Sequence, residues 1–384
     1  QIGKILTVFI TLSLLLIPDT DPASMTGDST PIPESRSFYM GFTPFPYEIS
    51  YQAVDYVYDK LATDADLIVH HFDSGVPWIE ALSGEPYGEG LRKDWQYRLD
   101  HTPEDHQIYV SVTPINILRV GLAPYYGEKD NLPLPSPWDT YSFDSPEVKT
   151  AFLKYCEDII AFFQPDYFAF GIEVNLLKSN NAALWDAYMT LHRYIYQELK
   201  AKYPDLPIFV SMTGIDLLEG YTDVDHESQI EAFQQVMEYS DYLGISIYPY
   251  MTRYMTSSLP LAIFDQLAEL TDKPLAITET GYPSQSFEVE ANGITLNFEG
   301  TEEKQQQYIQ LLLDAAQKYQ FRFVVNFILR DYDALWKMLG SPHDLTIVWR
   351  DTGLYDEDGH PRSALTTWQD ILKLPVIHPI DPDQ

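Results

Sequence analysis

The chain has 384 residues, of which 45% are hydrophobic and 14% aromatic, so it is long enough to bury a large core. Acidic residues outnumber basic ones by 57 to 24, and the formal charge of −33 argues against nucleic acid and anionic lipid as partners. The single cysteine, Cys156, excludes an intrachain disulfide.

The first residues have the pattern of an export signal. Lys4 precedes an apolar run at residues 5–18, which is short for a membrane-spanning helix and is followed by small and polar residues. We expect residues 1–18 to be a signal peptide without its true beginning, or alternatively an uncleaved anchor, and the protein to be exported. Residues 19–37, rich in Pro, Ser, Thr and Asp, are expected to form a flexible spacer.

From residue 38 onward, short runs of apolar and β-branched residues alternate with amphipathic stretches, a pattern typical of parallel βα units. Strands are predicted at 38–43, 66–71, 108–113, 167–173, 208–213, 242–248, 275–280 and 323–329. Helices are predicted at 51–62, within 87–100, and at 147–163, 182–203, 229–239, 260–270, 302–319 and 364–372. No glycine-rich phosphate loop follows the first strand. The pattern therefore predicts the α/β class and a single (β/α)8 TIM barrel over residues 38–372, with a tail at 373–384.

Two glutamates end predicted strands of this barrel. Active sites of such barrels lie at the carboxyl ends of the strands, where Glu173 closes the fourth strand and Glu279 the seventh. Strand alternation puts Glu173 on one face with the small Gly171, and Glu279 on one face with Leu275 and Ile277, so both are expected to point inward. Two carboxyls at one mouth repel each other, which raises the pKa of one of them. Glycosidic cleavage needs such a pair, one protonated and one ionised.

The segments around these residues resemble clan A glycoside hydrolases. Residues 277–284 (ITETGYPS) resemble the nucleophile segment of the arabinogalactan endo-β-1,4-galactanase family and are similar to that of the plant and fungal β-1,3-glucanases. Residues 247–249 (IYP) resemble the sixth-strand motif of these enzymes. The resemblance implies that Glu173 is the acid/base, that Glu279 is the nucleophile and that the Tyr248 hydroxyl positions it. It also implies retention of configuration, with carboxyl groups about 5 Å apart.

One residue departs from the clan pattern. Most clan members have Asn directly before the acid/base Glu, where it binds the sugar 2-hydroxyl, whereas this chain has Ile172. Asn175 is the candidate to reach the same hydroxyl.

Further candidates for substrate binding follow other predicted strands. Aromatic rings can pack on the C–H face of a sugar, and polar side chains can bond its hydroxyls. The set comprises His71, Asp73, Trp78, Asn116, Trp138, Asn175, Tyr282, Asn326 and Trp336. His70 and His71 are adjacent on a strand and point to opposite faces, so they are not expected to share a metal. Neither a metal nor another cofactor is predicted.

The sequence thus predicts a retaining β-glycoside hydrolase for a neutral polysaccharide, with β-1,4-galactan or arabinogalactan first and β-1,3-glucan or β-mannan behind it. No nucleic-acid or protein partner is predicted, and endo or exo action stays open. Two alternatives stand beside this prediction. One is a carbohydrate-binding barrel without catalysis, and the other is a metal-dependent barrel hydrolase that uses the histidines.

Overall fold

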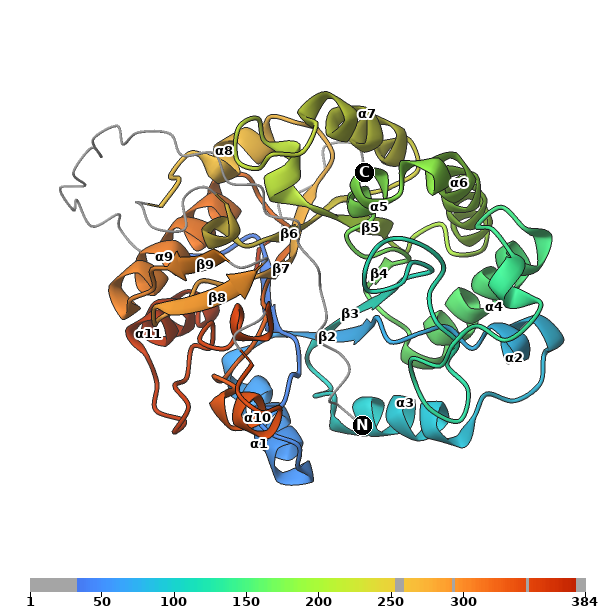
Figure 1. The fold of residues 1–384 in the computed structure, drawn as a ribbon. Helices are drawn as coiled ribbons and strands as arrows, with labels where there is room; N and C mark the ends of the chain where they lie inside the picture. The colour runs from blue at the N-terminus through green and yellow to red at the C-terminus, as the bar shows by residue number, and fades with distance from the viewer. Residues whose placement is uncertain (1–32, 253–258, 292–293, 343–344, 378–384) are drawn as a thin grey trace.

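The computed structural model describes residues 33–252, 259–291, 294–342 and 345–377. Within these ranges eight parallel strands close into a barrel in the order β1-β10-β7-β6-β5-β4-β3-β2 (Figure 1). The strands are β1 (Tyr39–Phe42), β2 (Leu67–Phe72), β3 (Gln107–Val112), β4 (Tyr167–Ala169), β5 (Ile208–Thr213), β6 (Leu243–Ile247), β7 (Leu275–Thr280) and β10 (Phe323–Asn326). The predicted TIM barrel is confirmed, and each predicted strand overlaps an observed one.

Helices surround the strands in a ring (Figure 1). They are α1 (Tyr51–Asp64), α2 (Trp78–Ser83), α3 (Glu89–His101), α4 (Pro146–Phe163), α5 (Asn175–Asn180), α6 (Trp185–Lys202), α7 (His226–Met237), α8 (Ile263–Ala268), α9 (Glu302–Lys318), α10 (Asp333–Met338) and α11 (Ser363–Leu372). Local chemistry fixes several of their starts. The side chains of Ser50 and Thr301 accept hydrogen bonds from the backbone N–H groups of Ala53 and Lys304, which caps α1 and α9.

The barrel interior is filled by side chains from alternate positions of the strands. These include Leu67, Val69, Tyr109, Tyr167, Ala169, Phe209, Ala276, Phe323 and Val325, all buried. The Tyr109 ring lies 4.9 Å from that of Phe323 and 5.8 Å from that of Phe209, measured between ring centroids. The barrel is therefore a packed core, and its chemistry is confined to the ends of the strands.

The chain segments on either side of the barrel pair with each other. The backbone N–H of Arg36 donates to the carbonyl of Pro375, and its guanidinium lies 2.5 Å from Asp66. Arg36 falls in the stretch expected as spacer, yet its side chain is buried. The expected signal peptide and most of the expected spacer lie outside the described residues. Among the helices that are described, none has the length and apolar character needed to cross a bilayer.

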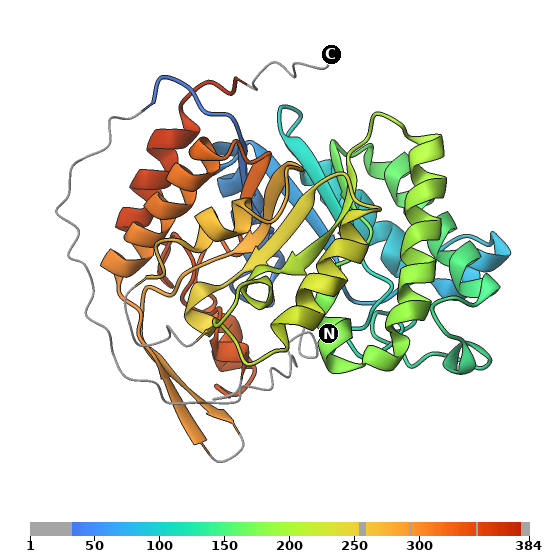
Figure 2. The same cartoon turned by 90° about the horizontal axis from the view of Figure 1, so that it is seen from above.

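A two-stranded hairpin, β8 (Phe287–Ala291) and β9 (Ile294–Phe298), follows β7 and was not predicted. It extends away from the end of the barrel at which β7 finishes (orange in Figure 2). Phe287 and Phe298 stack at 4.8 Å on its buried face, while Glu288 and Glu290 are exposed on the other. The alternating residues around an Asn-Gly pair at 292–293 are the sequence signal that predicts such a hairpin.

Candidate active site

Glu173 lies just beyond the end of β4, where the chain bends into α5. Its backbone has φ of +48°, a left-handed conformation that non-glycine residues rarely adopt. Its N–H donates to the Ser211 hydroxyl at 3.0 Å, and its Oε1 accepts from the Ser246 hydroxyl at 2.9 Å. Ser211 of β5 therefore holds the backbone of Glu173, and Ser246 of β6 holds its carboxylate. Unusual backbone conformations of this kind are common at functional sites.

Glu279 reaches the mouth through a β-bulge, which corrects the predicted alternation of the seventh strand. Ala276 lies in the barrel interior, whereas Ile277 packs among the helices. Ile277 and Glu279 pair with consecutive residues of β6, Ile245 and Ser246, so β7 carries one extra residue between them. Without that residue Glu279 would share the outer face of Ile277. The predicted inward direction holds, but the reason is the bulge and not a regular period of two.

The two carboxylates meet across β6. Ser246 is the register partner of Glu279 and donates to Glu173, and the Tyr248 hydroxyl donates to Oε1 of Glu279 as the resemblance implied. Removal from water and the charge of Glu173 raise the pKa of Glu279 to about 8, while Tyr248 and Arg119 oppose the rise. Two carboxyls that interact in this way titrate as a pair. At neutral pH the pair therefore retains one proton.

Replacing Tyr248 by phenylalanine tests its contact with Glu279. The hydroxyl favours the ionised carboxylate, so its loss is expected to raise the pKa of Glu279 further. We expect kcat to fall about 10- to 100-fold, the worth of a hydrogen bond to a charged group, and the acid limb of the pH–rate profile to move to higher pH. Tyr332→Phe is the matched control, because that buried hydroxyl bonds the Thr346 carbonyl instead. Equal profiles for the two variants would contradict the assignment.

Arg119 is a site residue that the sequence analysis missed. Its guanidinium donates to both oxygens of Asp73, at 3.0 and 2.8 Å, and lies 3.4 Å from Oε2 of Glu173. Asn116 holds the loop that carries Arg119, because its carbonyl accepts from Arg119 and its side chain accepts from the Val120 N–H. Asp73 and Asn116, predicted to bind sugar, are thus joined to the carboxylate pair through Arg119. The sequence did contain a signal for Arg119, because a single basic residue soon after the third strand is unusual in so acidic a chain.

Asp216 is a second residue that sequence reasoning missed. It lies in the short 3-10 helix Gly214–Leu217 that directly follows β5, and it is buried. Burial raises its pKa to about 6, opposed by a hydrogen bond from Thr222 and reinforced by the charge of Glu173. A carboxyl after the fifth strand therefore interacts with the pair at the mouth.

The two adjacent histidines of β2 point to opposite faces, as predicted. The Nδ1 of His71 lies 2.9 Å from the Ser111 hydroxyl, and burial lowers the pKa of His71 to about 4, so its ring is neutral. His70 packs on Phe163 of α4, and its Nε2 lies 3.0 Å from the Thr102 hydroxyl. The two imidazoles therefore cannot share a metal ion. His71 remains a candidate for bonding sugar.

Three aromatic residues predicted as sugar platforms are core residues instead. Trp78 and Trp138 are buried and stack on each other at 5.5 Å, and the indole N–H of Trp78 donates to the Ala123 carbonyl. Tyr282 is buried with its ring 5.5 Å from that of Tyr308. Rings with both faces packed have none left for a ligand. These assignments were wrong because sequence position alone does not distinguish an aromatic residue that lines a cleft from one that is buried beneath the lining residues.

Trp78→Phe tests this correction. We expect the free energy of unfolding to fall by about 1–2 kcal/mol, because the change removes packing volume and the bond to Ala123. The KM for an oligosaccharide should stay unchanged. Urea denaturation and steady-state kinetics measure the two quantities. A tenfold rise in KM without loss of stability would restore Trp78 as a platform.

The two asparagines at strand ends are also buried in structural roles. Asn175 donates to the Gln229 side chain at 2.8 Å, so the proposed contact with a sugar 2-hydroxyl is not available to it. Asn326 donates to the carbonyl of Ile328 at 2.8 Å. Trp336 is half-buried, with the Arg350 guanidinium 4.6 Å from its ring centroid. Only the last of these predicted ligands keeps accessible surface.

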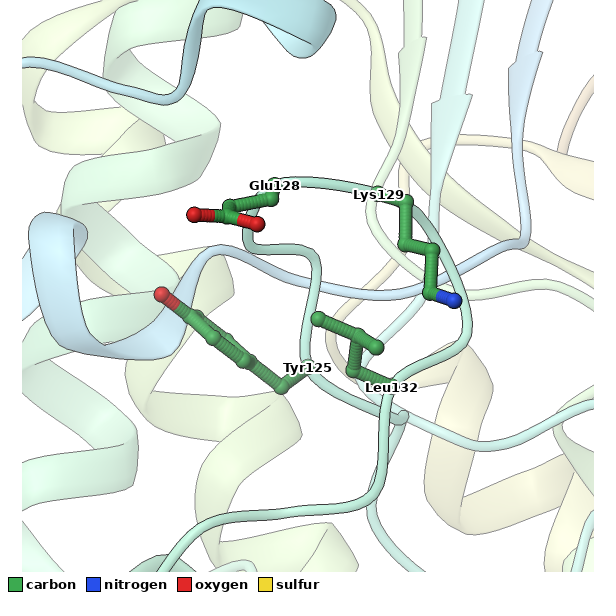
Figure 3. Close-up of a pocket in the computed structure, with 4 residues that line it drawn as sticks. All are labelled: Tyr125, Glu128, Lys129 and Leu132. Carbon is green, nitrogen blue, oxygen red and sulfur yellow. The ribbon is translucent and has the colours of Figure 1, made fainter.

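Two other features lie apart from the carboxylate pair. A shallow hollow in the loop after β3 is lined by Tyr125, Glu128, Lys129 and Leu132 (Figure 3). Near the end of β10, oxygens of Asp331, Asp333 and Glu357 lie close enough together to hold a metal ion. However, the Arg362 guanidinium lies 2.5 Å from Asp331 and 3.9 Å from Glu357. A cationic side chain therefore already neutralises part of the negative charge of this cluster.

Comparison with known proteins supports the architecture. No protein family and no curated protein matches the sequence, whereas solved structures match the fold. An exo-β-1,4-mannosidase from Opitutaceae bacterium strain TAV5 has a TM-score of 0.59 at 15% identity, covering 91% of this chain and 62% of the mannosidase. The shared feature is the barrel.

Two further structures share that barrel. A GH5_18 protein from Streptomyces cattleya, in complex with Manβ1-4GlcNAc, has a TM-score of 0.61 at 13% identity and covers 88% of this chain and 80% of its own. A fungal β-1,4-galactanase has a TM-score of 0.51 at 14% identity, with 86% of this chain and 94% of the galactanase covered. This chain therefore spans less than two thirds of the mannosidase but most of the other two.

Proposed function

We propose that this protein is a retaining β-glycoside hydrolase that cleaves a neutral polysaccharide. The observation that carries the proposal is the pair of carboxylates at one barrel mouth, Glu173 and Glu279, joined through Ser246 and Tyr248 of β6. The barrel is shared with a β-1,4-mannosidase and a β-1,4-galactanase, which is consistent with glycoside chemistry.

The proposed reaction gives each of the two carboxyls one role. In the first step Glu279 attacks the anomeric carbon while Glu173 gives its proton to the departing glycosidic oxygen, so a glycosyl ester forms on Glu279. In the second step Glu173 takes a proton from water, which attacks the same carbon and releases Glu279. Tyr248 orients the attacking carboxylate through its hydrogen bond. The first step requires the proton of the pair to lie on Glu173, because Glu279 attacks only in its ionised form, which its raised pKa makes the less populated form at neutral pH.

We propose β-1,4-galactan or arabinogalactan as the first substrate to test, on the resemblance of residues 277–284 and 247–249 to the galactanase family. The formal charge of −33 favours a neutral polymer, because pectate and sulfated chains would be repelled. The mannosidase and the GH5_18 protein share the barrel, which makes β-mannan the second choice.

The test is incubation of the protein with galactan, arabinogalactan, laminarin, mannan and xylan, with products sized over time. Oligosaccharides released first from galactan would support the proposal, and retained anomeric configuration in the initial products by NMR would support the mechanism. Hydrolysis of mannan alone would overturn the galactan assignment but not the roles of the glutamates. Binding without hydrolysis would favour the non-catalytic alternative, and activity lost in EDTA would favour the metal-dependent one.

We also propose that the protein is exported, since the apolar run at residues 5–18 has the length of a signal-peptide core. Expression of the full natural chain, followed by cell fractionation and N-terminal sequencing, tests this proposal. Cleavage after the apolar run would support a signal peptide, and an intact N-terminus in the membrane fraction would support the anchor.

A further inference from the structure

The guanidinium of Arg119 joins the ends of three barrel strands. It donates two hydrogen bonds to Asp73, which follows β2, and contacts Glu173 beyond β4 from its own place in the loop after β3. The Arg119 side chain is only 3% exposed. A buried arginine with two carboxylate partners has little freedom to move, so it can fix the position of Glu173.

The loop after β3 is shaped to deliver this side chain. Arg119 has φ of +54°, a conformation that non-glycine residues rarely adopt. Its N–H donates to the Asn116 carbonyl at 2.8 Å, and an isolated bridge between Ile115 and Leu122 closes the base of the loop. Side-chain amides of Asn180 and Asn181 bond the carbonyls of the residues on either side of Arg119. Contacts on both sides of the loop therefore maintain a backbone conformation that is unfavourable on its own.

The residue before Glu173 supplies no side-chain donor to the site. Position 172 is a buried isoleucine, which offers no hydrogen-bond donor to the site. The side-chain donors to the Glu173 carboxylate are instead Ser246 on Oε1 and Arg119 on Oε2. Among the described side chains, each oxygen of the carboxylate therefore has one donor, and only the donor on Oε2 is charged.

The charges around Glu173 are otherwise negative. Glu279 faces it from β7, Asp216 from the segment after β5 and Asp73 from beyond Arg119, and the neutral Tyr248 faces it from β6. Among the residues that the structure describes, Arg119 is the cation in contact with Glu173. Its charge also opposes the raised pKa of Glu279. Removing that charge would make the carboxylate pair hold its protons to higher pH.

We propose that Arg119 is the positioning residue of Glu173, and that its charge favours the anion that Glu173 becomes when it protonates the leaving oxygen. The clamp of Asp73 on Arg119 keeps the guanidinium in place through both steps. This role rests on the proposed glycoside hydrolysis, in which Glu173 is the acid and then the base. It assigns Arg119 to the reaction without any direct contact with the substrate.

Arg119→Met removes the charge while keeping an unbranched side chain. We expect kcat to fall about 10- to 100-fold with little change in KM, and the whole pH–rate profile to move to higher pH by about one unit. Arg119→Lys should restore the position of the profile, because the charge is kept, but only part of kcat, because the paired hydrogen bonds are lost. Asp73→Asn should lower kcat and move the profile slightly to lower pH, the opposite direction from Arg119→Met, because the charge of Asp73 helps to raise the pKa of Glu279.

Arg36→Met is the matched control. Arg36 is equally buried and pairs with Asp66 at 2.5 Å, beside the start of β2 and away from the mouth. The Arg36→Met variant should have a lower melting temperature than the wild type and an unchanged pH–rate profile. If Arg119→Met behaves in the same way, Arg119 is structural and the proposal is overturned. Should Arg119→Met not fold, the Lys variant and Asp73→Asn decide by the same readouts.

A measurement without substrate separates this proposal from the proposed function. Carbon-13 carboxyl titration of glutamate-labelled protein, assigned by difference with Glu279→Gln, follows the proton of the pair directly. We expect its midpoint in Arg119→Met to lie at higher pH than in the wild type, even if no glycan is cleaved. An unmoved midpoint would overturn the role of Arg119, whereas a moved midpoint in a protein inert on every glycan would overturn only the hydrolase.

Discussion

Glu279→Gln is expected to lower kcat on the cleaved glycan by about 10,000-fold or more, because the amide cannot attack the anomeric carbon. Sugar binding should survive, since glutamine has nearly the same size and can still accept from Tyr248. Turnover by reducing-end assay and affinity by calorimetry measure the two quantities. Glu288→Gln on the exposed face of the hairpin is the control and should keep full activity. A Glu279→Gln enzyme with more than a few per cent of normal turnover would refute the nucleophile.

The same substitution is expected to stabilise the fold at alkaline pH. The pKa of Glu279 is raised to about 8 in the folded protein, so the folded state binds this proton more tightly than the unfolded chain, where the value is about 4.3. Stability is therefore lost as the pH rises from the unfolded value through the folded one. Glutamine avoids that loss, and the variant should gain up to about 5 kcal/mol at pH 8.5, the worth of the whole pKa difference, and almost nothing below pH 4. A gain that does not depend on pH would contradict the raised pKa.

Glu173→Ala is expected to have the second largest effect, and one that depends on the leaving group. With an unactivated glycan, kcat/KM should fall about 100- to 10,000-fold, because no acid protonates the departing oxygen. A dinitrophenyl glycoside needs no such proton, so its first step should proceed at nearly the normal rate. The glycosyl ester should then accumulate and give a burst of dinitrophenol, since the base of the second step is also missing.

Azide supplies a direct control for Glu173→Ala. A small anionic nucleophile needs no general base, so it should speed release of the ester and yield a glycosyl azide of the same anomeric configuration as the substrate. The Glu279→Gln variant should show neither the burst nor the rescue. An equal loss on both substrates, without a burst, would mean that Glu173 is not the acid/base.

The sequence predicted the barrel well because its determinants are local. Strand and helix periods, and caps such as Thr301, depend on neighbours in the chain, and every predicted strand and helix overlaps an observed one. The short helices α2, α5 and α10 were not predicted, and β4 and β10 are shorter than the predicted strands. The two glutamates were also found, since residues at the carboxyl ends of barrel strands meet at one mouth whatever the loops do. The β8–β9 hairpin was missed although its alternation and Asn-Gly pair were visible.

Most predicted sugar ligands were wrong because burial depends on contacts between distant parts of the chain. Trp78 is covered by Trp138, 60 positions later, and Asn175 by Gln229 of α7. Arg119 was missed for the same reason, since its partners come from two other strand ends. Sequence position gave the end of the barrel on which a residue lies, but not the depth at which its side chain sits.

The extra residue in β7 also bears on how this mouth tolerates insertions and deletions. Before the bulge, the alternation of side chains in β7 places Ala276 in the barrel interior and Ile277 outside it. After the bulge, the alternation is shifted by one residue, so Glu279 points toward the mouth. Loss of one residue at Thr278 would leave every interior side chain in place and turn the carboxylate toward the helices. The directions of the side chains in the two halves of the strand are thus set separately, and a barrel without the bulge would have to place its nucleophile at a different spacing from the core.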